Sequence, residues 1–336
     1  MHSLSDKHMA GQRLMIGFDG IDLNEDLKYL IKHTQLGGLI LFRRNIEAPE
    51  QIRHLCNSAQ SFAKDCGLPE LLIAIDQEGG TVARLAHPFT VFPGNNHMQN
   101  QADAVNFAQI SARELIDVGI NMNMAPVLDI AFDPQASIMK ERAFGSDPDW
   151  VAQMGLRVID HLQAGGVMSV AKHFPGIGRT VLDSHLELPY LDTDEDDLWN
   201  RDCKPFRQAI AHGVSGMMLA HICFQALDEE WPASLSKKIA RNLLRHRMGY
   251  DGLVMTDDLD MGAIKKHWGI RLVMQQVLDA EIDVPLICHP GPDIETAYES
   301  ILTFQSDSLG NRSLCERSVE RIMRLKKRYL WCSNDR

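Results

Sequence analysis

Eight short apolar runs recur along the chain, and segments with helical spacing lie between them. The runs cover residues 14–18, 38–42, 71–75, 120–128, 167–171, 216–220, 253–255 and 284–288. Most of them are continuous rather than alternating in apolar character, which is typical of parallel strands covered on both faces. Eight strands that alternate with helices predict a (β/α)8 TIM barrel, and a doubly wound open sheet is the structural alternative.

Helix signals between the runs support this alternation. Asp147 and Pro148 fit an N-cap and a first helical residue, apolar side chains then recur at positions 151, 154, 158 and 162, and a glycine pair follows at 165–166. Similar apolar faces recur within 104–115, before Gly119, and within 273–280. Because no linker rich in Pro, Gly or Ser divides the chain, we expect residues 1–336 to form a single domain.

The charge balance and the cysteines exclude several classes of protein. The net charge of −11 argues against a general nucleic-acid binder and against a polybasic protein of membrane surfaces. Seven scattered cysteines without a Cys-x-x-Cys pair favour a reducing compartment over a disulfide framework. The start has no apolar core like that of a signal peptide, and no stretch reaches the roughly 20 apolar residues that span a bilayer, so we expect a cytoplasmic protein.

Two runs of like charge are interpreted as solvated surface. The acidic segment 192–197 fits a loop and the start of a helix, and the basic segment 321–328 fits an exposed helix end.

Polar side chains follow six of the apolar runs. They are Asp76, Asp129, the pair Lys172 and His173, His221, Asp257 and His289. In a barrel the ends of all strands meet at one rim, where catalytic groups are found. Each polar residue alone is a weak signal, but their recurrence after successive strands predicts a site at this rim.

Asp257 has two functional interpretations and one structural one. It is followed by Asp258 and Asp260, and three acids together favour either a nucleophile or a metal ligand. Thr256, Asp257 and Asp258 also suit the start of a helix, whose dipole would keep a nucleophilic carboxylate ionised. The residues alone do not separate these alternatives.

Asp183 and His185 follow a loop that Pro175, Gly176 and Gly178 keep irregular. The acid could orient the imidazole and favour its protonated form for general acid catalysis, or it could close its own turn beside an exposed histidine. Arg84, Arg142 and Lys172 fit either surface ion pairs or contacts with sugar hydroxyls and carboxylates.

Motifs for other chemistries are absent from the sequence. There is no Gly-x-Gly-x-x-Gly, no P-loop, no Gly-x-Ser-x-Gly and no His-Glu-x-x-His. We therefore expect no nucleotide, no cofactor and no metal ion.

The loop Lys172-His173-Phe174-Pro175-Gly176-x-Gly178, followed by Asp183-Ser184-His185, resembles the signature of the glycoside hydrolase family 3 β-N-acetylhexosaminidases. The other matching segments are 37–42 with 44–45, 76–80 with Arg84, 125–129, Arg142 with 144–145, and 256–259. They run in family order from about residue 12 to 290. The resemblance implies a (β/α)8 barrel without the second domain of many family 3 β-glucosidases.

The resemblance also implies roles for residues. Asp257 matches the nucleophile, His185 the acid/base and Asp183 its partner. The residues that hold the terminal N-acetylglucosamine are matched by Asp76, Arg84, Arg142, Lys172 and His173. Such a pair of groups suits a retaining glycosidase that forms a covalent glycosyl intermediate.

Three positions depart from the family pattern. Ile177 replaces the usual histidine, Arg179 replaces an acid or small residue, and Thr81 replaces an arginine. None is a matched catalytic position, but they put the preference for the leaving group in doubt.

The expected activity is a retaining exo-β-N-acetylglucosaminidase that acts on muropeptide-type glycosides in cell-wall recycling. A phosphorylase with the same site, a non-catalytic sugar-binding barrel and, last, a metal hydrolase are the alternatives. The only partner we expect is the carbohydrate substrate, without nucleic acid, membrane or a second copy of the chain.

Overall fold

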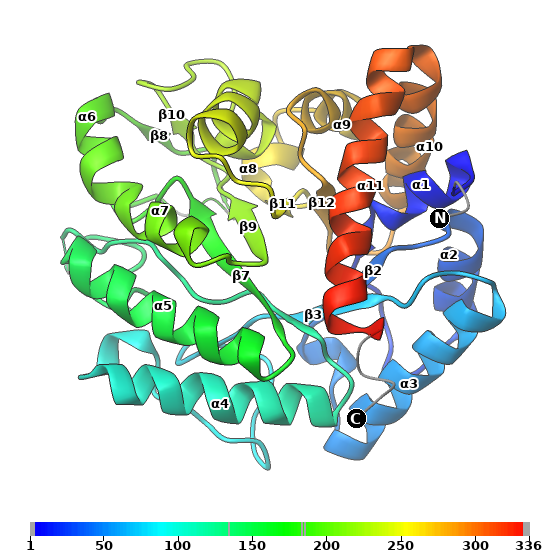
Figure 1. The fold of residues 1–336 in the computed structure, drawn as a ribbon, viewed down its shortest axis with the longest axis horizontal. Helices are drawn as coiled ribbons and strands as arrows, with labels where there is room; N and C mark the ends of the chain where they lie inside the picture. Colours follow the sequence, from blue (N-terminus) through cyan, green and yellow to red (C-terminus); the bar gives the residue numbers. More distant parts are fainter. Residues whose placement is uncertain (1–3, 134, 183, 185, 332–336) are drawn as a thin grey trace.

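All eight strands expected from the apolar runs are present, and they close into one parallel barrel (Figure 1). The computed structural model describes residues 4–133, 135–182, 184 and 186–331. The barrel strands are β1 (Met15–Ile16), β2 (Gly38–Leu41), β3 (Leu72–Ile75), β6 (Met122–Asn123), β7 (Met168–Phe174), β9 (Gly216–Leu219), β11 (Leu253–Asp258) and β12 (Val284–Ile287). Each pairs in parallel with the next along the chain, and β12 pairs with β1. This closure confirms the barrel and excludes the open sheet.

A helix follows every strand and packs on the outside of the barrel. The eight are α2 (Glu25–Thr34), α3 (Pro49–Asp65), α4 (Gln101–Asp117), α5 (Pro148–Ala164), α7 (Lys204–Ala211), η5 (Lys238–Arg247), α9 (Ile270–Asp279) and α10 (Pro292–Asp307). The expected signals hold for α5, where Asp147 caps the first turn and Gly165 is the C-cap.

Short elements and two further helices complete the described fold. They are α1 (Asp6–Gln12), η1 (Arg43–Asn45), η2 (Asn95–His97), α6 (Glu195–Asp197), η3 (Leu198–Asp202), η4 (Ala233–Leu235), α8 (Gly262–Lys265) and α11 (Leu309–Tyr329). Two small sheets lie outside the barrel: β4 (Gln77–Gly79) pairs with β5 (Val82–Ala83), and β8 (Tyr190–Leu191) pairs with β10 (Cys223–Phe224).

The barrel has an inner and an outer core, because alternate strand residues face opposite sides. Met15, Met122, Met168, Met218 and Met255 belong to the inner cluster. The outer cluster joins the other strand residues to the helices. Helix α11, red in Figure 1, lies beside α10 and α1 and adds Ile322 and Leu325 to the inner cluster, so it covers the end where the strands begin.

The basic segment 321–328 is helical as expected, but the prediction that it is exposed is wrong for two of its cations. Arg321 is buried and its guanidinium lies 2.9 Å from Asp283. Lys326 is fully buried, and its ammonium donates to Gln12 Oε1 at 2.6 Å and to the Gly37 carbonyl at 2.9 Å. The sequence pattern predicts solvent exposure for such a run because it does not show the partners of these side chains, which lie far away in the sequence.

Two features of the structure bear on the compartment: the hydropathy of the helices and the state of the cysteines. Within the described ranges, no helix has both the length and the hydropathy needed to cross a bilayer. The six cysteines that the structure describes are all free thiols, in agreement with the absence of a disulfide framework.

Candidate active site

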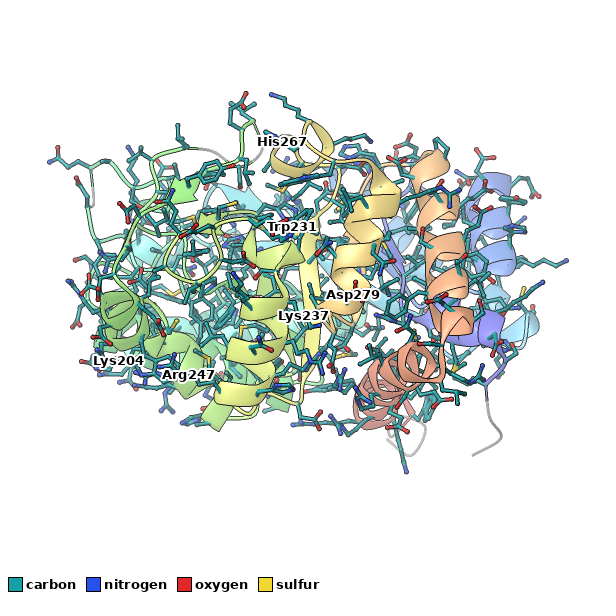
Figure 2. The ribbon with its side chains drawn as sticks, turned by 90° about the horizontal axis from the view of Figure 1, so that it is seen from above. Lys204, Trp231, Lys237, Arg247, His267 and Asp279 are labelled. Atoms are coloured by element: carbon teal, nitrogen blue, oxygen red, sulfur yellow. The ribbon has the colours of Figure 1, made fainter. Side chains whose placement is uncertain are left out.

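The predicted rim residues gather at the end of the barrel where the strands finish. Asp76 directly follows β3, Lys172 and His173 lie within β7, and Asp257 lies within β11. Two strands are thus longer than their apolar runs, because pairing with β9 and β12 resumes at Phe174 and Asp258 after a register shift. In Figure 2 the loop residues Trp231 and His267 lie at one end and Arg247, the last residue of η5, lies toward the other. Trp231 contacts Trp268 with ring centroids 5.3 Å apart, so the loops after β9 and β11 meet above the strands.

Five charged side chains form a continuous ion network at this rim. Lys172 Nζ lies 2.7 Å from Asp76 Oδ1 and 2.6 Å from Glu78 Oε1. Arg84 contacts Asp76 Oδ2 at 3.1 Å, and Arg142 binds both oxygens of Glu78, at 2.7 and 2.9 Å. The network joins β3, the β4–β5 hairpin, β7 and the loop before α5.

The ion network has a buried base and an accessible edge. The side chains of Lys172 and Glu78 are 2% and 1% exposed, whereas those of Asp76, Arg142 and Arg84 are 14%, 20% and 27% exposed. Removing one member of a buried ion pair leaves an uncompensated charge, so the base is strongly held. The edge presents carboxylate oxygens and guanidinium N–H groups together, which suits recognition of hydroxyl groups.

Every member whose pKa departs from its usual value stays ionised at neutral pH. Burial alone would raise the pKa of Asp76, but Lys172 and Arg84 hold it well below its usual range. The pKa of Glu78 is lowered in the same way, against burial, by Lys172 and Arg142. Burial opposes the charge on Lys172, but Asp76 and Glu78 raise its pKa above the usual value.

His173 is fixed by Asp129, which follows β6. Asp129 Oδ2 lies 2.7 Å from His173 Nδ1, and its Oδ1 accepts the Ile177 N–H at 2.8 Å. Because the carboxylate occupies Nδ1, the other ring nitrogen faces the network, where His173 Nε2 lies 3.4 Å from Arg142. Asp129 therefore orients an imidazole and also holds the start of the loop that follows β7.

Asp257 lies in the strand β11, so its interpretation as a helix N-terminus is wrong. The next helix, α8, begins at Gly262, with Met261 at its N-cap position. Burial would raise the pKa of Asp257, but His221, His173 and Lys172, together with the hydrogen bond from the Asp258 N–H at 2.8 Å, lower it. The carboxylate is kept ionised by side chains from β7 and from the end of β9, and not by a helix dipole.

His221 joins the ends of β9 and β11. Its Nδ1 lies 2.6 Å from Ser234 Oγ, and its Nε2 lies 2.8 Å from the Asp258 carbonyl, to which it donates. The ring is buried and lies close enough to Asp257 to be the largest influence that lowers the pKa of that acid. His221 thus supports the backbone on which Asp257 stands.

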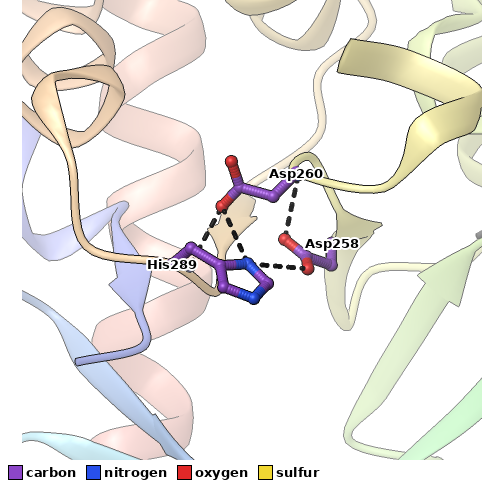
Figure 3. Close-up of side chains that lie close together, drawn as sticks. All are labelled: Asp258, Asp260 and His289. Carbon is purple, nitrogen blue, oxygen red and sulfur yellow. Dashed lines mark hydrogen bonds and ion pairs between the residues drawn. The ribbon is translucent and has the colours of Figure 1, made fainter. Parts of the chain in front are cut away.

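Asp258, Asp260 and His289 are the group of described residues whose type and spacing would allow a metal ion (Figure 3). Their oxygens already have other partners. Asp258 Oδ1 accepts the N–H groups of Asp260 and Cys288, and Asp260 contacts Lys265 at 2.6 Å and the His289 N–H at 3.0 Å. Burial and Asp260 raise the pKa of Asp258 to about 6. These contacts give the cluster a structural role, which is to hold the end of β11 against the residues after β12.

A cavity of about 660 Å³ lies at the opposite end of the barrel. Its lining includes Glu70, Gly119, Gly165 and Tyr329, which stand before the barrel strands or at the end of α11, and none of the predicted site residues. In such barrels this end serves stability, whereas chemistry occurs at the other.

Two predicted catalytic residues, Asp183 and His185, lie outside the described residues. Whether His185 approaches Asp257 therefore stays a prediction. The other predicted site residues, Asp76, Arg84, Arg142, Lys172, His173 and Asp257, come together at one rim.

Sequence reasoning alone assigns no site role to Glu78, Asp129 or His221. A signal exists for Glu78, because residues two apart in an extended segment face the same side and Asp76 is a predicted site residue. Asp129 and His221 were placed at the rim, but no spacing indicated which groups they contact.

Comparison with known proteins gives one consistent result. The model of the Glycosyl hydrolase family 3 N terminal domain matches residues 7–325. The beta-hexosaminidase of Nitrosomonas eutropha is 34% identical over 301 residues, which are 87% of this chain and 84% of that protein. Beta-hexosaminidase A of Pseudoalteromonas piscicida is 34% identical over 367 residues, 96% of this chain but 61% of that protein.

Solved structures agree with the sequence relatives. A glycoside hydrolase family 3 beta-N-acetylglucosaminidase from Paenibacillus superposes with a TM-score of 0.93 at 38% identity, covering 97% of this chain and 63% of that one. The beta-N-acetylhexosaminidase from Beutenbergia cavernae gives 0.90 at 25% identity, covering 97% and 99%. The chain thus spans less than two thirds of the Paenibacillus and Pseudoalteromonas proteins.

Proposed function

Because the chain belongs to glycosyl hydrolase family 3, we propose that it is a retaining exo-β-N-acetylglucosaminidase with Asp257 as the nucleophile. One observation carries the proposal. Asp257 is a largely desolvated carboxylate whose pKa is lowered by His221 and His173 against the effect of burial, and Lys172 of the ion network also lowers this pKa. A nucleophilic carboxylate must be ionised and poorly solvated, and this environment supplies both properties.

The edge of the ion network, together with Lys172 and His173 beside it, would hold the sugar. Asp76, Arg84, Arg142, Lys172 and His173 would contact the ring hydroxyls and the acetamido group, and Glu78 and Asp129 would keep their partners in position. A preorganised array of this kind also stabilises charge that develops in the transition state.

The reaction would proceed in two steps. Asp257 attacks the anomeric carbon while a proton passes to the leaving oxygen, and water then releases the sugar from the ester. We propose His185 as the proton donor and then the base, oriented by Asp183. An imidazole suits this work because its pKa lies near neutral pH.

The finer features of the proposal follow the family resemblance. We propose muropeptide fragments with a terminal N-acetylglucosamine as substrates, and a cytoplasmic monomer as the working form. All described candidate groups stand on this barrel, which supports the barrel as the catalytic unit.

The nucleophile is tested with a nitrophenyl β-N-acetylglucosaminide. Asp257→Ala should lower kcat by about 10³-fold or more, because the covalent route is lost. Asp65→Ala, an exposed position at the end of α3, is the matched control and should retain full activity. A fluorinated sugar that forms a slow intermediate should label the peptide containing Asp257. Labelling of another residue, or unchanged turnover in Asp257→Ala, contradicts the assignment.

The same assay separates hydrolysis from phosphorolysis. With added phosphate, the product should remain free N-acetylglucosamine. Formation of the sugar 1-phosphate would favour the phosphorylase alternative.

A further inference from the structure

We infer that Arg179 is a positioning residue, which clamps the first part of the loop after β7 to η3. The segment that bears the proposed acid/base then begins at a fixed position. The inference rests on the proposed function and deepens it. Arg179 is one of the three departures from the family pattern, and no catalytic role falls on it. The loop stem is defined here as residues 175–180.

Arg179 makes an unusually complete set of contacts for a loop residue. Its Nε donates to both oxygens of Asp202, at 3.1 and 3.0 Å, and its NH2 lies 2.8 Å from Asp197 Oδ2. The guanidinium also stacks over the ring of Phe132, 4.2 Å from the centroid. These partners come from α6, η3 and the loop after β6, so one side chain joins three segments to the stem.

The buried carboxyl group of Asp202 depends on Arg179 to stabilise its ionised form. Its side chain is 2% exposed, and burial raises its pKa to about 6 although Arg179 pulls it down. An ion pair whose acid is buried is strongly geometry-dependent, because losing the cation leaves an uncompensated group. The contact is therefore a defined anchor rather than a solvated surface pair.

The rest of the loop stem is packed against backbone on both sides of Arg179. A side chain at Gly178 would lie 1.9 Å from the Ile130 carbonyl oxygen, and one at Gly176 would lie 3.2 Å from Asp202 Cβ. The Ile177 N–H donates to Asp129, and the Thr180 N–H donates to the Ile177 carbonyl at 3.0 Å. The stem thus touches the carboxylate that orients His173 and the acid that holds Arg179.

The packing is interrupted directly after the loop stem. Val181 and Leu182, which follow Thr180, are 62% and 53% exposed, and the chain is held again at Ser184, which is buried and whose carbonyl accepts the Ala263 N–H at 3.2 Å. Chain beyond a fixed stem samples fewer positions than chain beyond a loose one, and proton transfer requires close approach of donor and acceptor. Loss of the clamp should therefore reduce acid catalysis more than it reduces sugar binding or nucleophilic attack.

The kinetic test compares two leaving groups. A dinitrophenyl leaving group departs with little proton donation, whereas the disaccharide of two β-1,4-linked N-acetylglucosamines needs it. Arg179→Ala should lower kcat/KM for the disaccharide about 10- to 100-fold, within the range of general acid catalysis, and for the aryl glycoside less than about threefold. Arg179→Lys should recover part of the loss, because one ion pair can form.

Arg201 supplies the matched control. It stacks on the same Phe132 ring, 4.5 Å from the centroid, but lies on the exposed surface. Arg201→Ala should leave kcat/KM unchanged for both substrates. If Arg179→Ala lowers kcat/KM equally for both substrates, or for neither, the positioning role is overturned.

Hydrogen exchange gives a second readout that does not need activity. Exchange of the Ile177 and Thr180 amides should be at least about tenfold faster in Arg179→Ala than in wild type or Arg201→Ala. Unchanged exchange overturns the clamp even if the glycosidase proposal holds. Failure of wild type to cleave either glycoside would instead overturn the proposed function, and the exchange result would still decide the clamp.

Discussion

A single carboxylate, Glu78, holds two of the cations that face the proposed sugar site. It contacts Lys172 at 2.6 Å and Arg142 at 2.7 and 2.9 Å, and it is nearly inaccessible to solvent. Glu78 is the acid that Lys172 and Arg142 share. Because Lys172 also contacts Asp76, a change at Glu78 should reach the part of the network that is exposed to a ligand.

Replacing Glu78 with Gln keeps the shape of the side chain and removes its charge. We expect a loss of roughly 3 kcal/mol of unfolding free energy, because Arg142 loses its counter-ion and the buried Lys172 keeps only Asp76. The Michaelis constant should rise about tenfold or more as Arg142 and Lys172 shift, with a smaller effect on kcat. Urea unfolding and steady-state kinetics measure both. Glu229→Gln, at an exposed position, is the control, and equal behaviour of the two variants would contradict the role of Glu78.

At the scale of elements, the apolar runs located every barrel strand but not all of the strand bounds. Strand β7 extends to Phe174 and β11 to Asp258, three residues beyond their runs, because pairing with β9 and β12 resumes there after a register shift, whereas β6 covers only two residues of its run. Periodicity cannot report such ends, since the polar residues there are held by partners on other strands. The same reason explains why Asp129 and His221 could be placed at the rim but not given partners.

The contact between the β9 and β11 ends has a measurable consequence. His221→Ala removes the donor to the Asp258 carbonyl and the largest influence that lowers the pKa of Asp257. The pKa of Asp257 should then rise, so the acid limb of kcat/KM against pH should move to higher pH. The profile of an aryl glycoside measures this limb. His212→Ala, a half-exposed histidine after α7, should leave it in place. If the acid limb of His221→Ala stays at the wild-type pH, the His221 ring does not affect the pKa of Asp257.

At the scale of the whole molecule, the two ends of the barrel use buried charge differently. The site end pairs each described cation of the ion network with acids, whereas α11 places Lys326 at the other end beside the neutral groups Gln12 Oε1 and the Gly37 carbonyl. The sequence predicts this helix but not its depth, because the partners of Lys326, Gln12 and Gly37, lie near the start of the chain. Burial lowers the pKa of Lys326 to about 7, and the distant Glu70 only partly opposes it.

Lys326 should therefore make stability depend on pH. Below about pH 7 the lysine is protonated in both states, and the folded state carries the full cost of the buried charge. Between about 7 and its unfolded pKa near 10, the unfolded chain binds more protons, so the unfolding free energy should rise with pH. Lys326→Met removes this dependence. Subtracting its unfolding free energy from that of wild type between about pH 7 and 9 should give a difference that grows by up to about 1 kcal/mol per unit. Lys32→Met, an exposed change in α2, should follow wild type, and parallel curves for wild type and Lys326→Met would mean that the buried amine keeps its proton.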